Sequence, residues 1–361
     1  MDKKSFKGIQ VGVLGLARSG IAAANLAYSL GARVLVSEAR TRQQCSKVLP
    51  ELKKGIDTEF GGHSRSLLNS ALIVKSPGIP HHIPILKELH KRNIPVIGEI
   101  ELAARIIHPK RLIAITGTNG KTTTTTLVGK LFKNSGQSTI VGGNIGAPLA
   151  AQTGKISRKT NVVLEISSYQ LEDSPQFRPH ICSILNITPD HLEHHGSMKN
   201  YIDAKALIFR NQTKKDYCIL NYDDIYCRKL AARCPGTVIF FSRKTVLKKG
   251  VFYRDNNFIV KLPGSTYRLP AELKIPGMHN IENALASIAM AAIAGIKPSV
   301  IRKTLSAFPG VEHRIEFSGA PNGVTYINDS KGTNVDSTVV ALRSFPAPIW
   351  LILGGRDKGA P

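Results

Sequence analysis

The sequence predicts an α/β protein made of three successive segments, and one pattern in each segment carries the prediction. Residues 9–37 read as strand, glycine-containing turn, helix and strand, the unit of a doubly wound parallel sheet. Residues 112–134 read as an apolar strand that leads through a Gly-Lys loop into a helix, and residues 324–353 as strand, helix and strand. We therefore expect a Rossmann-like N-terminal domain at 1–108, a central P-loop-type domain with a parallel or mixed sheet at 109–312, and the start of an incomplete Rossmann-like C-terminal domain at 313–361.

The composition is that of a globular protein with more than one core. A chain of 361 residues exceeds one ordinary domain, and 42% apolar with 20% charged residues argues against disorder. The first apolar run follows basic residues but is short and lacks a small-residue cleavage site, so a buried strand explains it better than a signal peptide. The longest apolar helical stretch, residues 285–294, is too short to span a bilayer. We expect a cytoplasmic protein without membrane insertion.

The net charge of +24, from 49 basic and 25 acidic residues, is spread over the first two segments and forms no basic tail. A positive field attracts anionic nucleotides, but it also gives weak, salt-sensitive binding to nucleic acid. The net charge alone therefore does not distinguish a nucleotide-binding protein from a nucleic-acid-binding one. Because no DNA- or RNA-recognition motif appears, we expect no specific nucleic-acid partner. A nucleic-acid-binding protein stays open as an alternative.

The first segment is organised around a glycine turn. Strand patterns cover residues 9–14 and 33–37 with a helix at 21–30 between them, and further strands are expected at 71–74 and 95–97 with a helix from Pro84. The turn from Gly15 to Gly20 lacks the middle glycine of the G-x-G-x-x-G fingerprint, and Glu38 ends the second strand. This pattern is compatible with a dehydrogenase. The phosphate loop of the second segment makes that interpretation the less favoured one.

The later segments continue the alternation of strands and helices. In the second segment we expect strands at 162–166, 181–185 and 217–220, two short β runs around the turn residues 255–257, and helices at 280–294 and 298–307. In the third segment we expect strands at 324–327 and 349–353. The helix between them has Asn334 or Asp336 as its N-cap candidate.

Residues 113–123, with the sequence I-A-I-T-G-T-N-G-K-T-T, form the strongest local signal. Backbone amides at the start of a helix can cradle phosphates, Lys121 can reach the β- and γ-phosphates, and the Thr122 hydroxyl can face a magnesium ion. The loop departs from G-x-x-x-x-G-K-[ST], because Ile115 stands where the first glycine would be. An ordinary Gly-Lys turn into a threonine-rich helix is the alternative.

The loop and three further motifs together resemble the Mur ligases and their relative, folylpolyglutamate synthetase. The further motifs are G-G-N-I-G at 142–146, E-I-S-S-Y-Q-L-E at 165–172 and N-D-S-K-G-T-N at 328–334. The resemblance runs in order from about residue 9 to the end. It implies an ATP-dependent amide ligase of peptidoglycan precursor synthesis, with a central ATPase domain and an acyl-phosphate intermediate. Within the family, the motifs are most similar to members that join D-glutamate to UDP-N-acetylmuramoyl-L-alanine.

A carboxylate at the end of a buried strand, as at Glu165, suits magnesium, although a helix-start or salt-bridge glutamate is the alternative. Zinc is not indicated by the histidines at 191–195, since no cysteine accompanies them and the five cysteines form no C-x-x-C pair. The resemblance implies two magnesium ions and a carbamylated Lys205, which the sequence alone would read as a solvated helix lysine. It leaves His194 and His195 unassigned, as surface-loop residues. The implied metal residues are Thr122, Glu165, His191 and Lys205, and the implied catalytic residues are Lys121, His191 and Lys205.

The resemblance also implies contacts for ATP and for the muramoyl and amino-acid substrates. Without it, Asn280 or Asn283 would be read as a helix N-cap and Arg314 as a linker salt bridge. The implied ATP residues are Gly117, Thr118, Asn119, Gly120, Lys121, Thr122, Thr123, Asn280, Asn283, Arg314 and Asp329. The implied substrate residues are Arg18, Ser19, Arg40, Gly78, Asn144, Gln170, Lys331, Thr333 and Lys358.

Two alternatives share much of this chemistry: a related Mur or folylpolyglutamate-type ligase, and a nucleotide-binding protein without ligase activity. Full-length family members have a larger third domain, so for a chain of this length we expect nucleotide binding to survive and ligation to be weak or absent. We also expect a monomer.

Overall fold

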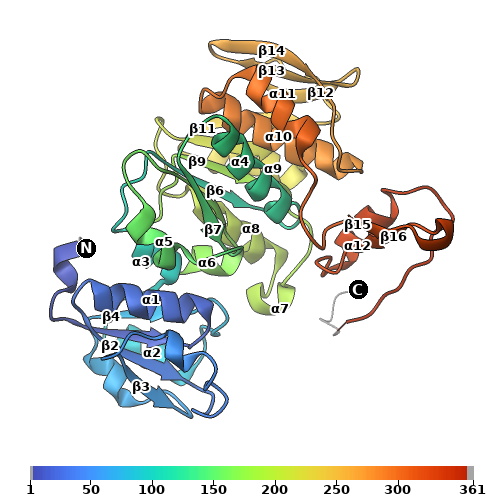
Figure 1. Ribbon diagram of the computed structural model, residues 1–361. Helices are drawn as coiled ribbons and strands as arrows, with labels where there is room; N and C mark the ends of the chain where they lie inside the picture. Colours follow the sequence, from blue (N-terminus) through green and yellow to red (C-terminus); the bar gives the residue numbers. More distant parts are fainter. Residues whose placement is uncertain (1–2, 356–361) are drawn as a thin grey trace. The chain divides into compact units, whose positions relative to one another are not determined.

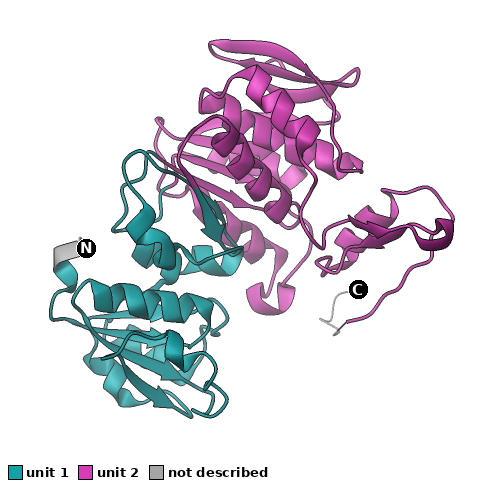
Figure 2. Ribbon diagram, in the orientation of Figure 1, with its two compact units in different colours: residues 1–110, 140–178 teal, residues 111–139, 179–361 magenta. Residues whose placement is uncertain are grey.

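The computed structural model describes residues 3–355, which form two compact units (Figure 2). Unit 1 comprises residues 1–110 and 140–178, and unit 2 comprises residues 111–139 and 179–361. The three-domain division expected above stays a prediction. Within the described residues, no helix is both long and apolar enough to cross a membrane.

Unit 1 contains a five-stranded parallel sheet in the order β3-β2-β1-β4-β5. It is the sheet drawn in blue to cyan in Figure 1. The chain crosses from one side of β1 to the other between β3 and β4, so the strand order reverses at β1 and β4, as in doubly wound folds. The strands of this sheet are β1 (Gln10–Leu14), β2 (Arg33–Glu38), β3 (Asp57–Phe60), β4 (Leu72–Lys75) and β5 (Val96–Gly98). The Rossmann-like prediction is confirmed here, and β3 is a strand that the sequence analysis missed.

Each helix of unit 1 follows a strand in the chain. Gly20, in the first turn of α1, has no room for a side chain, because an added Cβ would lie 1.9 Å from the Gly15 carbonyl oxygen. The helices are α1 (Arg18–Ser29), α2 (Pro84–Lys91), α3 (Glu99–Ala104), α5 (Leu149–Gln152) and α6 (Ser168–Glu172), and the unit also holds the neighbouring strands β7 (Thr139–Gly143) and β8 (Asn161–Glu165). Short 3-10 turns complete it at η1 (Lys3–Phe6), η2 (Leu49–Glu51), η3 (Arg65–Asn69) and η4 (Thr153–Lys155).

Unit 2 is built on strands in the order β14-β13-β12-β11-β10-β9-β6. The pairings from β6 to β12 are parallel, and β12, β13 and β14 form an antiparallel meander, so the sheet is mixed as predicted. The strands are β6 (Arg111–Thr116), β9 (Ile181–Ile184), β10 (Tyr217–Asn221), β11 (Thr237–Ser242), β12 (Gly250–Arg254), β13 (Asn257–Leu262) and β14 (Ser265–Pro270). The turn between β12 and β13 places Asp255 and Asn256 at positive φ, as residues of a two-residue hairpin turn require.

Helices α4 (Lys121–Asn134), α10 (Met278–Ile293) and α11 (Pro298–Ala307) pack against one another, and α10 also packs on β10, β11 and β12. Ten residues of α10 are buried, which makes this helix the centre of the unit's core. Shorter helices follow the middle strands: α7 (Leu192–His195), α8 (Met198–Ala206), α9 (Ile225–Leu230), η5 (Leu207–Phe209) and η6 (Ala231–Arg233). The sequence pattern predicts a helix from Thr124 to Asn134, whereas α4 begins three residues earlier, at Lys121, and includes the whole threonine run.

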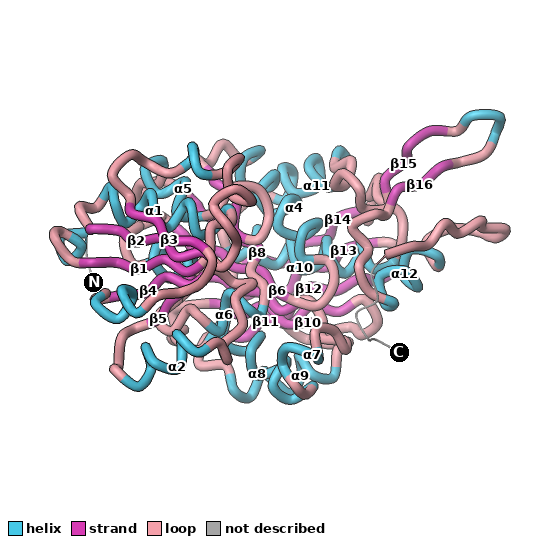
Figure 3. Tube along the Cα trace, turned by 90° about the horizontal axis from the view of Figure 1, so that it is seen from below, coloured by secondary structure: helices cyan, strands magenta, loops and turns pink. Residues whose placement is uncertain are grey.

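The last part of unit 2 differs most from the prediction. It forms an antiparallel pair, β15 (Glu316–Gly319) with β16 (Tyr326–Asn328), followed by α12 (Val335–Leu342). A short turn, η7 (Pro321–Gly323), joins the two strands. Asn334 caps α12 through a capping box with Ser337, as one of the two predicted caps. The predicted strand at 349–353 is wrong: these residues are loop in Figure 3, since no strand of the described chain lies beside them to pair with.

Candidate functional site

The loop between β6 and α4 presents the N-terminus of a helix to its surroundings. Gly120 is the N-cap at φ +81°, and the first intrahelical hydrogen bond runs from the Thr124 N–H to the Gly120 carbonyl. The amides of Lys121, Thr122 and Thr123 precede that bond, which makes them the groups that a helix start can turn towards an anion. An added Cβ on Gly120 would lie 2.2 Å from Asn283 Oδ1, so only glycine fits.

The loop is held in shape by the segment that follows β9. Thr118 donates its N–H to the Asn186 carbonyl, and its hydroxyl accepts the Thr188 N–H at 3.0 Å. Asn119 and Asn186 exchange two hydrogen bonds, Asn119 N–H to Asn186 Oδ1 at 2.8 Å and Asn186 Nδ2 to the Asn119 carbonyl at 3.1 Å. The loop is therefore preorganised by contacts within unit 2.

Two lysines meet at one carbonyl of this loop. Lys121 Nζ donates to the Gly117 and Thr118 carbonyls, and Lys205 Nζ donates to the Gly117 carbonyl at 2.8 Å. The reading of Lys205 as a solvated helix lysine is wrong, since its side chain is 2% exposed and lies against the Tyr201 ring. Burial and the neighbouring Lys121 charge hold the pKa of Lys205 well below its usual range. A lysine of lowered pKa is a stronger nucleophile at neutral pH than a solvated one.

His191 lies at the N-terminus of α7, with φ +53° and a half-exposed ring. Its Nε2 is 3.6 Å from Asp190 Oδ2, and its N–H donates to Asp190 Oδ1. Asp190 also accepts Asn334 Nδ2 at 3.2 Å. The surface-loop reading of the next two histidines is wrong, because His194 and His195 belong to α7 and His195 is buried.

A pocket of about 210 Å³ lies within unit 2 beside the loop. It brings together six of the residues that the resemblance implies for ATP: Asn119, Gly120, Thr123, Asn283, Arg314 and Asp329. Asp336 and Glu282 also line the pocket and were missed by the sequence analysis, because their chain positions are far from the loop. Asp336 Oδ2 accepts hydrogen bonds from Asn119 Nδ2 and the Thr188 hydroxyl, which ties the start of α12 to the loop.

The asparagine pair of α10 does not cap the helix. Gly277 is the N-cap, and the reading of Asn280 or Asn283 as a cap is therefore wrong. Asn283 Oδ1 accepts the Thr124 hydroxyl and its Nδ2 donates to Asn280 Oδ1, so the pair joins α10 to the first turn of α4. The buried Thr124 hydroxyl thus has a hydrogen-bond partner, which explains why a threonine suits this position of the threonine run.

Arg314 and Asp329 lie opposite each other in the pocket wall, with Arg314 Nη1 3.9 Å from Asp329 Oδ1. Burial raises the pKa of Asp329, and Arg314 opposes that shift. Burial and the same guanidinium lower the pKa of His279 to about 4, so its ring is neutral at physiological pH.

The residues predicted to bind the amino-acid substrate lie elsewhere in the last part of the chain. Lys331 Nζ donates to the Glu312 carbonyl, Thr333 is exposed, and Lys358 lies outside the described residues.

In unit 1, the Glu38 side chain links the glycine turn to the residues that follow β2. Its carboxylate accepts the Leu16 N–H, the Arg40 N–H and the Arg40 guanidinium. Burial alone would raise the pKa of Glu38, but these donors and the Arg40 charge lower it to about 2. Arg40 is thereby fixed at the carboxyl end of the sheet, where doubly wound folds bind ligands.

The other predicted residues of unit 1 follow strands of two different sheets, β1 and β4 in one and β7 and β8 in the other. Arg18 is exposed and its guanidinium donates to the Gly146 carbonyl, while Ser19 is half-buried and Gly78 exposed. Asn144 Nδ2 donates to Glu165 Oε1 at 2.8 Å, and Glu165, the last residue of β8, is buried. Gln170 forms a capping box with Ser167 at the start of α6.

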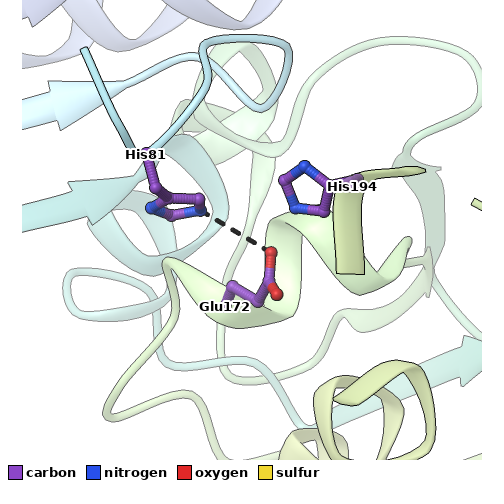
Figure 4. Close-up of side chains that lie close together, drawn as sticks. All are labelled: His81, Glu172 and His194. Carbon is purple, nitrogen blue, oxygen red and sulfur yellow. Dashed lines mark ion pairs between the residues drawn. The ribbon is translucent and has the colours of Figure 1, made fainter. Parts of the chain in front are cut away.

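A second charged group in unit 1 was missed by the sequence analysis. Lys75 and Asp173 are both buried and form an ion pair at 2.8 Å, and Lys75 Nζ also donates to the Ile79 carbonyl. His81 Nε2 lies 3.6 Å from Glu172 Oε2, the ion pair drawn as a dashed line in Figure 4. The pair of Lys75 with Asp173 fixes the loop that contains Gly78.

The candidate metal donors of each unit, taken separately, fit magnesium only in part. Glu165 in unit 1 and Asp190 and His191 in unit 2 offer lone pairs to a cation, and the Thr122 hydroxyl lies in the first turn of α4. The ammonium of Lys205 is a donor and repels a cation. A carbamate on its Nζ would change it into an oxygen ligand, which magnesium prefers.

Two family models match the chain. One is the Mur ligase middle domain, over residues 115–291, and the other is the MurD-like N-terminal domain of Mur ligases, over residues 9–98. The chain is 46% identical over 359 residues to the UDP-N-acetylmuramoylalanine–D-glutamate ligase of Koribacter versatilis, covering 98% of this chain and 79% of that protein. It is 43% identical over 368 residues to the ligase of the same name from Elusimicrobium minutum, covering 99% and 79%.

Solved structures share the fold at lower identity. The UDP-N-acetylmuramate-alanine ligase MurC from Thermotoga maritima is 24% identical, with a TM-score of 0.58, covering 93% of this chain and 77% of that one. A pseudomurein peptide ligase type C from Methanothermus fervidus is 21% identical, with a TM-score of 0.55, covering 94% and 78%. At these identities the likeness concerns the fold alone.

Proposed function

This chain belongs to the Mur ligase family, and we propose that it is an ATP-dependent ligase that adds D-glutamate to UDP-N-acetylmuramoyl-L-alanine through an acyl phosphate. Relatives that carry this ligase name are 43–46% identical to it over almost the whole chain. The structural observation that supports the chemistry is the pocket of unit 2, where a glycine-capped helix start faces Arg314 and Asp329.

The chemical problem is that a carboxylate resists attack by an amine, because its negative charge repels the lone pair. Transfer of the γ-phosphoryl group of ATP to the alanyl carboxylate gives an acyl phosphate, a good electrophile. The loop amides and the Lys121 ammonium would hold the phosphates and stabilise the charge that develops during transfer. Arg314 would contribute a planar guanidinium suited to phosphate oxygens. The amine of D-glutamate then attacks, and phosphate leaves.

Magnesium, when bound, would neutralise phosphate charge and align the reacting oxygens. We assign its ligation to Thr122, Glu165, His191 and a carbamylated Lys205, with two ions. The buried, low-pKa amine of Lys205 supports carbamylation, because only a neutral amine attacks carbon dioxide. Lys121, His191 and Lys205 are accordingly the proposed catalytic residues.

The remaining predicted residues would hold the substrates. In unit 1, Arg18, Ser19, Arg40 and Gly78 would bind the uridine nucleotide, and Asn144 and Gln170 the muramoyl part. In unit 2, Asn280, Asn283 and Asp329 would bind the nucleoside of ATP, and Lys331, Thr333 and Lys358 the incoming D-glutamate. Because ATP and UDP-sugars are cytoplasmic metabolites, we propose that the reaction takes place in the cytoplasm, and that the protein acts as a monomer.

The test is product formation followed by mass spectrometry, which detects even a few turnovers. The protein is incubated with magnesium, ATP and UDP-N-acetylmuramoyl-L-alanine, and with D-glutamate, L-glutamate, L-alanine, glycine or D-alanine in parallel. We expect a mass increase of one glutamate residue with D-glutamate alone. A product with another amino acid would contradict the proposal, and the absence of any product would favour the alternative of a nucleotide-binding protein without ligase activity.

A further inference from the structure

The lining of the unit 2 pocket includes three carboxylates, and two of them have a cationic partner. Glu282 accepts a hydrogen bond from Arg243 Nε at 2.9 Å, and Asp329 Oδ1 lies 3.9 Å from Arg314 Nη1. The third carboxylate belongs to Asp336, in the first turn of α12. Its surroundings differ from those of the other two, because no guanidinium or ammonium of the described residues pairs with it.

Neutral donors hold the Asp336 side chain. Its Oδ2 accepts Asn119 Nδ2 at 2.6 Å and the Thr188 hydroxyl at 3.1 Å, and within residues 3–355 its Oδ1 has no hydrogen-bond partner. The amide dipole at the start of α12 offsets only part of a carboxylate charge. A negative charge therefore lies in the pocket without a cation to balance it.

This charge lies beside the loop that is shaped for an anion. Asn119, which binds Asp336, directly precedes Gly120, the N-cap of α4, and all three residues line the pocket. The amides at the helix start attract phosphate oxygens. A carboxylate bonded to the same loop repels them, and the repulsion is stronger in a partly buried pocket than in water.

The two opposing effects depend differently on the form of the triphosphate. A divalent cation bound to the phosphates cancels part of their charge and is itself attracted to a carboxylate. The free triphosphate has no such cation, so Asp336 would repel it fully. An anion site with an unbalanced carboxylate therefore fits an anion that brings its own cation.

We propose that Asp336 makes this pocket select a triphosphate bound to a divalent cation over the free triphosphate. A site can discriminate by an unpaired charge set against the wrong ligand as well as by contacts to the right one. In the proposed reaction, free ATP would fill the loop without the cation that assists phosphoryl transfer, and Asp336 disfavours that complex. The inference rests on the proposed use of ATP and names the residue that selects its form.

The test is isothermal titration with ATP at one ionic strength, in excess magnesium and in EDTA. We expect the wild type to bind the magnesium complex at least about 30-fold more tightly than free ATP. Asp336→Asn keeps the shape of the side chain and an acceptor oxygen for Asn119, but it removes the charge. It should reduce the ratio of the two affinities by about 10-fold, mainly by strengthening the binding of free ATP. Asp336→Ser, a second uncharged variant, should reduce the ratio in the same direction.

Two controls locate the effect. Tripolyphosphate has neither base nor ribose, and it should show the same loss of discrimination in Asp336→Asn, because the repulsion acts on the phosphates. Asp255→Asn removes an identical charge from the turn between β12 and β13, where 79% of the side chain is exposed and the residue does not line the pocket. It should keep the wild-type ratio for both ligands.

An unchanged ratio in both uncharged variants of Asp336, or a reduction that Asp255→Asn matches, would overturn the proposal. So would a wild-type protein that binds free ATP as tightly as the magnesium complex, a result that leaves the proposed ligase function standing. Failure of the wild type to bind ATP in either form would contradict the proposed function together with this inference.

Discussion

Lys121 and Lys205 donate hydrogen bonds from their Nζ atoms to the same acceptor, the Gly117 carbonyl oxygen, at 2.9 and 2.8 Å. Two positive charges at one neutral oxygen would repel each other, and burial together with the Lys121 charge lowers the pKa of Lys205. Removal of the charge from Lys205 would relieve this repulsion. The arrangement therefore favours a neutral or anionic group at Lys205 when a triphosphate and its metal occupy the loop.

The first prediction concerns Lys205. Replacement of Lys205 by Ala should abolish ligation, because the proposed anionic ligand is lost, and added formate or acetate should restore part of the rate. Lys199→Ala, on the same helix with 84% of its side chain exposed, is the matched control and should remain active. Full activity of Lys205→Ala without added carboxylate would remove the basis for a carbamate.

The second prediction concerns Lys121. Lys121→Ala should weaken Mg-ATP binding by at least about 100-fold, since a charge-assisted contact to phosphate is lost. Titration calorimetry measures the effect. Lys133→Ala, an exposed lysine in the last turn of the same helix, should bind ATP as the wild type does. Similar ATP affinity in the two variants would show that Lys121 does not contact the phosphates.

The third prediction compares the stability cost of alanine at two glycines, Gly120 before α4 and Gly136 after it. Gly136→Ala should destabilise the protein by about 1 kcal/mol, because its φ is +78° but no atom crowds an added Cβ. Gly120→Ala combines φ +81° with a 2.2 Å approach to Asn283, so it should cost clearly more and also weaken ATP binding. Chemical unfolding compares the two variants. Equal costs would mean that the loop adjusts freely around residue 120.

The fourth prediction concerns Glu99 and pH. Burial raises the pKa of Glu99 from 4.5 to about 7 in the folded protein, although its carboxylate accepts the Ala150 N–H. The folded state thus binds this proton more tightly than the unfolded state. The stability from this group is complete below about pH 4.5 and is lost as the pH rises through 7, by about 3 kcal/mol at most.

Glu99→Gln should therefore be more stable than the wild type at pH 8, and the difference should shrink towards pH 5. Urea unfolding at both values measures this change. Glu88→Gln, a more exposed glutamate on α2, should show no such trend. A variant that is equally destabilised at both pH values would indicate a purely structural role for the carboxyl group.

Local patterns predicted most elements of the fold. Apolar runs located β1, β2, β4 and β6, and turn chemistry located the hairpin at Asp255 and Asn256 and the cap at Asn334. The exceptions depended on distant partners. An apolar run at 349–353 predicted a strand, but a strand needs a neighbour to accept its hydrogen bonds.

The sequence predicted the site residues that belong to a local motif. It did not predict those that only the three-dimensional fold brings to the site. The Gly-Lys loop was recognisable from its sequence alone. The burial of Lys205, in contrast, arises from the packing of α8 on the loop. Glu282 and Asp336 reach the pocket only through the three-dimensional arrangement of α10 and α12. No short-range pattern distinguishes such residues from surface carboxylates.

The most direct test of the account follows an oxygen atom. UDP-N-acetylmuramoyl-L-alanine labelled with oxygen-18 in its alanyl carboxylate is incubated with the protein, magnesium, ATP and D-glutamate, and the inorganic phosphate is analysed by mass spectrometry. An acyl phosphate predicts that one labelled oxygen appears in each phosphate released with product. Product formed together with unlabelled phosphate would contradict the acyl-phosphate mechanism.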